Sequence, residues 1–130
     1  MWHLLTENPK TIQSIYGEKI PSLQDINLRE VKIINGEDVQ CYLKFDTKEL
    51  PKEKPLKWVE RNVNTVQIEL LLVKTEILFF EIIAKFLIGD MQIELIEDYK
   101  KVSLISKGKV LFTLKAKWLN IQSVTGYATE

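Results

Sequence analysis

The sequence predicts a mainly β protein, an antiparallel β-sandwich or open barrel of about seven or eight strands with one short N-terminal helix. Three observations lead to this prediction. Apolar and polar residues alternate with period two over most of the chain, turn signals separate several of these stretches, and one segment near the start carries helix-capping residues instead. At 130 residues the chain has the length of a single domain, residues 1–130, with one core.

The first expected element is a helix of about two turns between Asn8 and Tyr16. Asn8 is a favoured N-cap residue, and Pro9 suits the first helical position because the N–H that it lacks would be unpaired there. Apolar residues then recur at helical spacing from Ile12. Gly17 fits the C-terminal cap, so the helix is expected to end there.

A bent strand and a hairpin are expected next. The apolar residues of the stretch 26–33 change face between Leu28 and Val31, which predicts a bulge or a bend. Asn35-Gly36 is the strongest hairpin signal in the chain, because both residues tolerate the positive φ of a tight turn. The stretch 39–45 alternates strictly and predicts a half-buried strand. Alternation then stops from residue 46 to residue 58, where two prolines predict a long irregular loop of a kind that often carries function.

Further strands are expected at 64–72, 91–95, 102–104, 110–116 and 119–127, with a turn at Lys107-Gly108. The stretch from Glu76 to Ile88 is ambiguous. Glu81 and Lys85 have the i,i+4 spacing of a helix, whereas the enrichment in phenylalanine and isoleucine favours a buried strand. We favour the strand and keep the helix as the alternative.

Composition and charge argue against several classes of protein. The chain has 18 basic and 18 acidic residues, and this balance is unlike that of a general nucleic-acid binder or a binder of anionic membranes. Cys41 is the single cysteine, so neither an internal disulfide nor a cysteine-based zinc cluster is expected. The N-terminus lacks the features of a signal peptide, and the apolar run 77–88 is shorter than the roughly 20 residues of a membrane span. We therefore expect a cytoplasmic protein with no membrane contact.

No catalytic signature is present. His3 is the single histidine, so histidine-based catalysis would depend on a chain terminus. The five glycines are scattered and fit neither a phosphate-binding loop nor a dinucleotide fingerprint. Acidic pairs such as Glu94 with Glu97 could divide acid and base roles only if their environments separate their pKa values, and a solvated strand face is the simpler interpretation. We expect no enzyme activity, no cofactor and no metal site.

Charge is uneven along the chain. Acidic residues dominate from Glu76 to Asp98, and every charged residue from Lys100 to Lys117 is a lysine. Pairing of opposite charges across neighbouring strands explains this pattern most simply. The alternative is a bipolar surface that steers a charged partner.

The loop and the residues after it supply the candidates for partner binding. Trp58 lies between Lys57 and Arg61, and tryptophan and arginine are enriched in binding hot spots. Trp58 could equally close one end of the barrel or sandwich, and we favour that structural role. The predicted partner-binding residues are Asp46, Glu53, Lys57, Trp58 and Arg61.

The order of features along nearly the whole chain resembles the immunity protein 50 family of bacterial polymorphic toxin systems. The matching residues are Ile15-Tyr16-Gly17, Pro21-Ser22-Leu23, Pro51, Pro55, Lys57-Trp58, Asn64-Thr65-Val66-Gln67 and Gly126-Tyr127. Each motif is short and is shared by other β proteins, so the resemblance depends on their order and spacing. It implies a cytoplasmic protein that binds and neutralises a cognate toxin domain without catalysis. It also implies that the residues at Pro55, Lys57, Trp58 and Asn64 maintain the fold more than they contact toxin.

Two other functions remain to be separated from this one. A small β-sandwich module could bind a sugar or another small molecule, which calls for a concave face lined by aromatic side chains. The candidate aromatic residues are scattered along the sequence: Tyr42, Trp58, Tyr99 and Trp118. A small carboxylate-dependent enzyme would need two acids in one pocket. Protein binding is favoured, with a toxin domain as the partner and a homodimer as a further assembly to consider.

Overall fold

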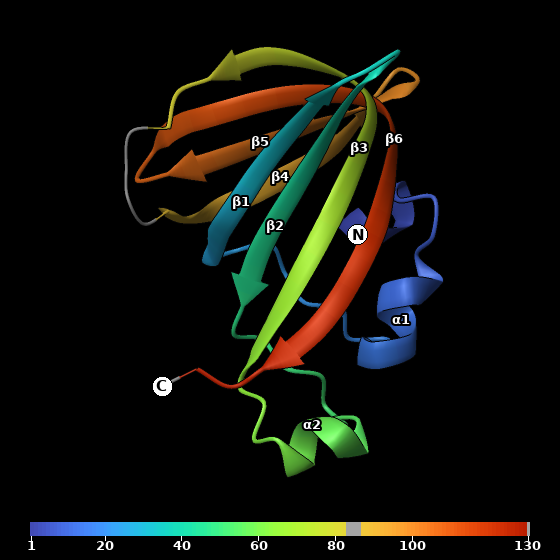
Figure 1. The fold of residues 1–130 in the computed structure, drawn as a ribbon, viewed down its shortest axis with the longest axis vertical. Coiled ribbons are helices and arrows are strands. Elements are labelled where there is room, and N and C mark those ends of the chain that lie inside the picture. The colour runs from blue at the N-terminus through green and yellow to red at the C-terminus, as the bar shows by residue number, and fades with distance from the viewer. Residues whose placement is uncertain (83–86, 130) are drawn as a thin grey trace.

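The computed structural model of the chain describes residues 1–82 and 87–129. Six strands of these residues form one antiparallel sheet that closes into a barrel in the order β1-β2-β3-β6-β5-β4 (Figure 1). The mainly β class is thereby confirmed. The elements are η1 (Trp2–Leu5), α1 (Lys10–Tyr16), β1 (Ile26–Asn35), β2 (Val39–Thr47), α2 (Leu56–Glu60), β3 (Thr65–Phe80), β4 (Leu87–Ile96), β5 (Tyr99–Ser106) and β6 (Lys109–Tyr127).

The number of strands is slightly below the expected seven or eight, because two long strands each replace two expected ones. β3 joins the stretch 64–72 to the first part of the ambiguous stretch, and β6 joins 110–116 to 119–127. Both strands curve strongly (Figure 1). Lys74 interrupts β3 with a φ of 52°, and the buried side of β6 changes phase between Ala116 and Leu119. A bend resets the alternation, so one bent strand has the sequence pattern of two.

The ambiguous stretch is strand at both of its ends, whereas Glu81 and Ile82 are described and belong to neither a strand nor a helix. Residues 76–80 belong to β3, and Leu87 and Ile88 begin β4. Residues 83–86 lie outside the described part of the chain.

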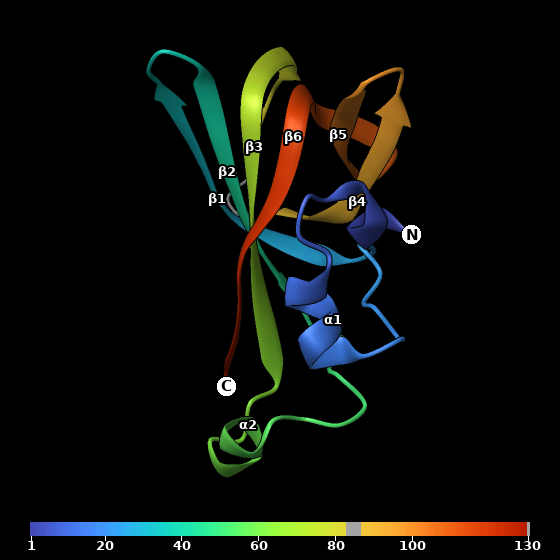
Figure 2. The ribbon, with the colours of Figure 1, turned by 90° about the vertical axis from the view of Figure 1, so that its right-hand side faces the viewer.

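The expected N-terminal helix is α1, and Gly17 ends it with a φ of 68° while its N–H bonds to the carbonyl of Gln13. Asn8 has a different role from the predicted side-chain cap. Its amide nitrogen donates to the carbonyl of Ile121, and its amide oxygen accepts from the N–H of the same residue, each at 2.8 Å. Asn8 therefore ties the start of α1 to β6, and Figure 2 shows α1 beside that strand.

The sequence predicts a single helix, but the structure has two further short helices besides α1. η1 precedes it, and α2 occupies the end of the loop that was expected to be irregular. Helices of four and five residues are too short to show an apolar stripe. The bulge and the place of both hairpins were predicted correctly, but the tight turn with positive φ expected at Asn35-Gly36 was wrong, because Asn35 ends β1 and neither residue has a positive φ. The register of β1 shifts between Leu28 and Glu30, Asn35 pairs with Val39 across the first hairpin, and Lys107-Gly108 turns between β5 and β6.

The barrel interior is the main core. Its largest fully buried side chains include Leu43, Phe45, Ile68, Leu70, Leu104, Phe112 and Leu114. β1 and β4 close the barrel along a short contact, in which Ile26 pairs with Gly89 and Leu28 with Leu87. The described pairing of β1 with β4 ends at Leu28 and Leu87, because Leu87 is the first residue of β4.

The uneven charge of the sequence is partly explained by strand pairing. Glu94 faces Lys101 across β4 and β5, and Glu76 faces Lys115 across β3 and β6. These neighbours agree with the simpler interpretation. Among the described residues, no helix combines the length and the apolar character that crossing a membrane requires.

Candidate partner-binding surfaces

The end of the barrel below β3 is closed by Trp58, which is only 7% exposed. A Cβ atom at Gly126 would lie 2.7 Å from Cε2 of Trp58 and 2.8 Å from Cγ1 of Val63. Glycine at this position therefore lets the indole ring contact the backbone of β6. The carbonyl of Trp58 also accepts the N–H of Val63 at 2.9 Å. These contacts give Trp58 the structural role that the sequence favoured.

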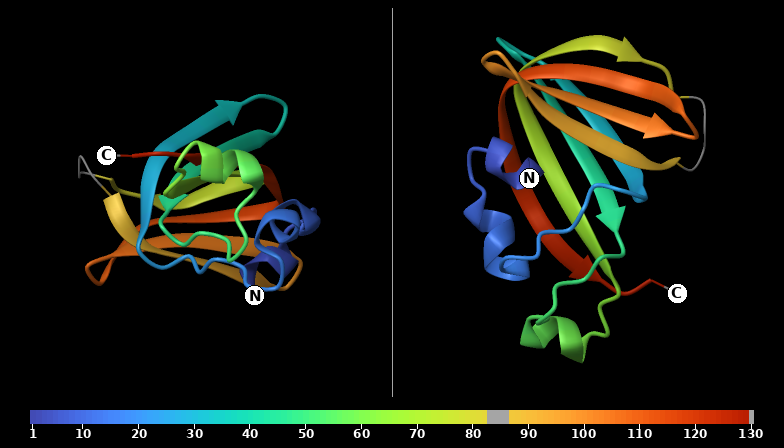
Figure 3. Two further views of the ribbon diagram at one scale, coloured as in Figure 1. Left: turned by 90° about the horizontal axis from the view of Figure 1, so that it is seen from below. Right: turned by 180° about the vertical axis from the view of Figure 1, so that it is seen from behind.

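A polar network fixes the base of the same segment. The ammonium group of Lys48 donates to the hydroxyl of Thr65 at 2.6 Å and to that of Thr129 at 2.9 Å. The side chain of Asn64 donates to the carbonyl of Thr129 and accepts its N–H. α2 is thus attached both to the start of β3 and to the C-terminal end of the chain, which lie together (Figure 3).

Asp46 is buried on the outer side of β2, where three side chains surround its carboxylate. Gln67 donates to it at 3.1 Å, the Tyr127 hydroxyl donates a short hydrogen bond, and Nε of Arg29 lies 3.4 Å away. Burial, and then the hydrogen bond and the charge of Asp46, raise the pKa of Tyr127 to about 12. Asp46 therefore holds strands β1, β2, β3 and β6 together and presents little surface to a partner.

The exposed part of the predicted site is a small tip, which we call the α2 tip and define as Leu56, Lys57, Val59 and Arg61. Leu56 is 74% exposed and Val59 is 55% exposed, so the tip offers apolar atoms to a partner. Lys57 and Arg61 lie in the same segment, and both are exposed. Glu53 is exposed in the preceding loop. Three of the five predicted residues are exposed to a partner, namely Glu53, Lys57 and Arg61. The other two, Asp46 and Trp58, are buried and have structural roles.

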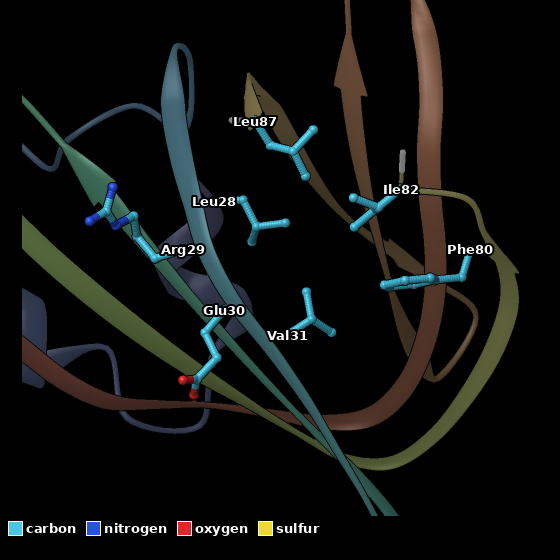
Figure 4. A pocket seen from close by; sticks show the side chains of 7 residues that line it. All are labelled: Leu28, Arg29, Glu30, Val31, Phe80, Ile82 and Leu87. Atoms are coloured by element: carbon cyan, nitrogen blue, oxygen red, sulfur yellow. The ribbon is translucent and has the colours of Figure 1, made fainter. Parts of the chain in front are cut away.

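Among the described residues, a pocket of about 390 Å³ lies between β1, the end of β3 and the start of β4. Figure 4 shows Leu28, Val31, Phe80, Ile82 and Leu87 pointing into it. The two polar residues of the lining, Arg29 and Glu30, point away from the others, and Arg29 pairs with Asp46. A small-molecule site normally adds several convergent polar groups to its apolar lining. This lining supplies apolar contact without them.

The reactive groups of the described residues are buried and separate. The thiol of Cys41 is fully buried, and burial raises its pKa to about 11. His3 is also buried, and burial lowers its pKa. Within residues 1–82 and 87–129, no group of three or more histidine, cysteine or acidic residues is arranged to hold a metal ion. The buried side chains of His3 and Cys41 are therefore not placed to act on a substrate.

A comparison with protein families shows which family this chain belongs to. The family model described as Immunity protein 50 matches residues 8–127. The chain belongs to the Immunity protein 50 family. The matched range extends from α1 to the last residue of β6, so the match covers the whole barrel together with the α2 tip and its supports. Comparisons with curated proteins and with solved structures found no match.

Proposed function

We propose that this protein binds a cognate toxin domain and neutralises it by stoichiometric association, without catalysis, in the cytoplasm of a bacterial cell. The observation that carries the proposal is the match to the Immunity protein 50 family over nearly the whole chain. The burial of His3 and Cys41 supports the non-catalytic part.

The α2 tip and Glu53 are proposed as one contact with the toxin. An anchored element that exposes apolar and charged side chains loses little conformational entropy on binding, because the scaffold already holds it in place. Trp58 provides that anchor through Gly126 and Val63. Asp46 contributes indirectly, by joining the strands that carry the loop.

The function is tested by co-expression with each candidate toxin domain that a neighbouring gene encodes. Growth should recover in proportion to the amount of the immunity protein, and the purified proteins should form a complex with one copy of each. Rescue at amounts far below one molecule per toxin would indicate an enzyme. Absence of both rescue and complex would remove the proposed function.

The contact at the α2 tip is tested with the double variant Lys57→Glu/Arg61→Glu. The matched control is Lys10→Glu/Lys19→Glu, which makes the same change of charge at two exposed lysines near α1. We expect the first pair to weaken the complex about tenfold and the control pair to change it little, since opposed charges contribute to association. Equal affinities of the two double variants would exclude the tip as a contact.

A further inference from the structure

The outer side of β1, β2, β3 and β6 carries a second surface, built from two adjacent rows of cross-strand neighbours. Cys41, Leu72 and Leu119 are fully buried and point into the barrel, so the residues on either side of each point outward. We call this surface the lysine–aromatic face. Its rows are Ile34, Gln40, Val73 and Trp118, and Lys32, Tyr42, Leu71 and Asn120.

Each aromatic ring of this face has a lysine over it. The ammonium group of Lys32 lies 4.6 Å from the ring centre of Tyr42. Lys74 and Lys117 lie 5.4 Å and 4.9 Å from that of Trp118. Tyr42 and Trp118, which are far apart in the sequence, thus belong to one surface. The face combines rings, aliphatic side chains and three positive charges.

The three lysines have no acidic partner within the described residues. The ion pairs there join Arg29 to Asp46, Lys44 to Glu69, Lys100 to Glu7 and Lys109 to Glu81. None of them includes Lys32, Lys74 or Lys117. The cation–π contacts compensate only part of a positive charge at an exposed site. The face therefore retains its positive charge although the whole chain is neutral.

The placement of two of these lysines does not favour the fold itself. Val73 pairs with Trp118 and Thr75 with Ala116, so Lys74 and Lys117 occupy the intervening positions of the two strands. Like charges at facing positions destabilise a sheet. Lys74 also has a φ of 52°, which is uncommon for a residue other than glycine. A negative partner would offset the repulsion between the two lysines.

Acidic groups border this face and limit the kind of partner. Glu76, Glu97 and Asp98 line a hollow of about 270 Å³ together with Lys74 and Lys117. An extended phosphate backbone crossing the face would meet these carboxylates. A folded protein can instead place its own acids over the lysines and apolar atoms over Leu71 and Val73, as the mixed composition of protein interfaces requires.

We infer that the lysine–aromatic face binds an acidic, carboxylate-bearing surface of the toxin. The identity of the partner rests on the proposed function. Trp118 and Tyr42 serve as anchors, and Lys32, Lys74 and Lys117 select negative charge and accelerate association. This contact is separate from the α2 tip.

The test separates binding from stability with one substitution. Lys74→Glu removes the repulsion with Lys117 but sets an acid near Glu76, Glu97 and Asp98, so the melting temperature of the free protein should change little. Affinity for the co-encoded toxin domain, measured by titration calorimetry, should nevertheless fall about tenfold at low salt and less at high salt. Trp118→Ala should weaken the complex further. Lys10→Glu serves as the charge-matched control.

The outcomes distinguish the inference from the function it rests on. If the native protein binds toxin and Lys74→Glu binds equally well, the face is not the contact, and the immunity function stands. If the native protein binds no toxin, the proposed function fails. If the face instead binds a single-stranded oligonucleotide in a Lys74-dependent manner while toxin affinity is unchanged, a protein partner is wrong for this surface.

Discussion

The contact of Trp58 with Gly126 allows a quantitative prediction of stability. A buried tryptophan side chain removes about 200 Å² from water, which at about 25 cal/mol per Å² corresponds to about 5 kcal/mol as an upper bound. The end of the barrel can collapse partly around a truncated residue. We therefore expect Trp58→Ala to lower the free energy of unfolding by about 3 kcal/mol.

Gly126→Ala tests the same contact from the other side. The added methyl group would lie 2.7 Å from Cε2 of Trp58 and 2.8 Å from Cγ1 of Val63, so both side chains have to move. Overpacking of this kind costs about 1–3 kcal/mol. In the Trp58→Ala variant the indole ring is absent. Gly126→Ala should therefore lower the free energy of unfolding by at least about 1 kcal/mol less in that variant than in the native protein.

Urea denaturation of the native protein, the two single variants and the double variant measures this coupling. A matched control is Gly36→Ala, because the nearest atom to a methyl group there is 3.9 Å away. Strictly additive effects of Trp58→Ala and Gly126→Ala would refute the contact. A Trp58→Ala variant as stable as the native protein would also overturn the structural role of this residue and point back to a partner hot spot.

Three further predictions concern individual groups. Because the pKa of Tyr127 is raised to about 12, its neutral form stabilises the fold fully below pH 10, and this contribution is lost as the pH rises through 12. Asp46→Asn should lower the pKa of Tyr127, as measured by a titration of phenolate absorbance. An unchanged titration would contradict the hydrogen bond from Tyr127 to Asp46. The Cys41 thiol should resist thiol reagents in the native protein and react fully in urea, so fast native labelling would contradict its burial. Gly89→Ala should speed hydrogen exchange in β4 and β5, because its methyl group would lie 2.5 Å from the carbonyl oxygen of Ile105 in β5. Unchanged exchange would contradict that close approach.

Local features of the fold were predictable because each depends on a few neighbouring residues. Lys107-Gly108 and the phase change after Leu28 gave a correct turn and a correct bulge, and Asn35-Gly36 gave the correct place of the first hairpin. The number of strands depended on a longer-range feature. A bend such as that at Lys74 breaks the alternation without ending the strand, and only the hydrogen-bond partners on β6 show that the strand continues.

The candidate site was predictable only in part, because some of its contacts join residues that are far apart in the sequence. Trp58 could be assigned to the end of a loop, but its burial depends on Gly126, more than 60 residues away. The lysine–aromatic face has a weak signal in the sequence. Trp118 follows Lys117 and Tyr42 lies two residues before Lys44, yet the register that joins the two rings through Leu71 and Val73 is not encoded locally.

The most direct test of the central claim is a titration of toxin activity with the purified protein. We predict that activity falls linearly and reaches zero at one molecule of immunity protein per toxin, with both proteins recovered intact from the complex. Inactivation of many toxin molecules by one molecule of this chain, or full toxin activity in its excess, would contradict it.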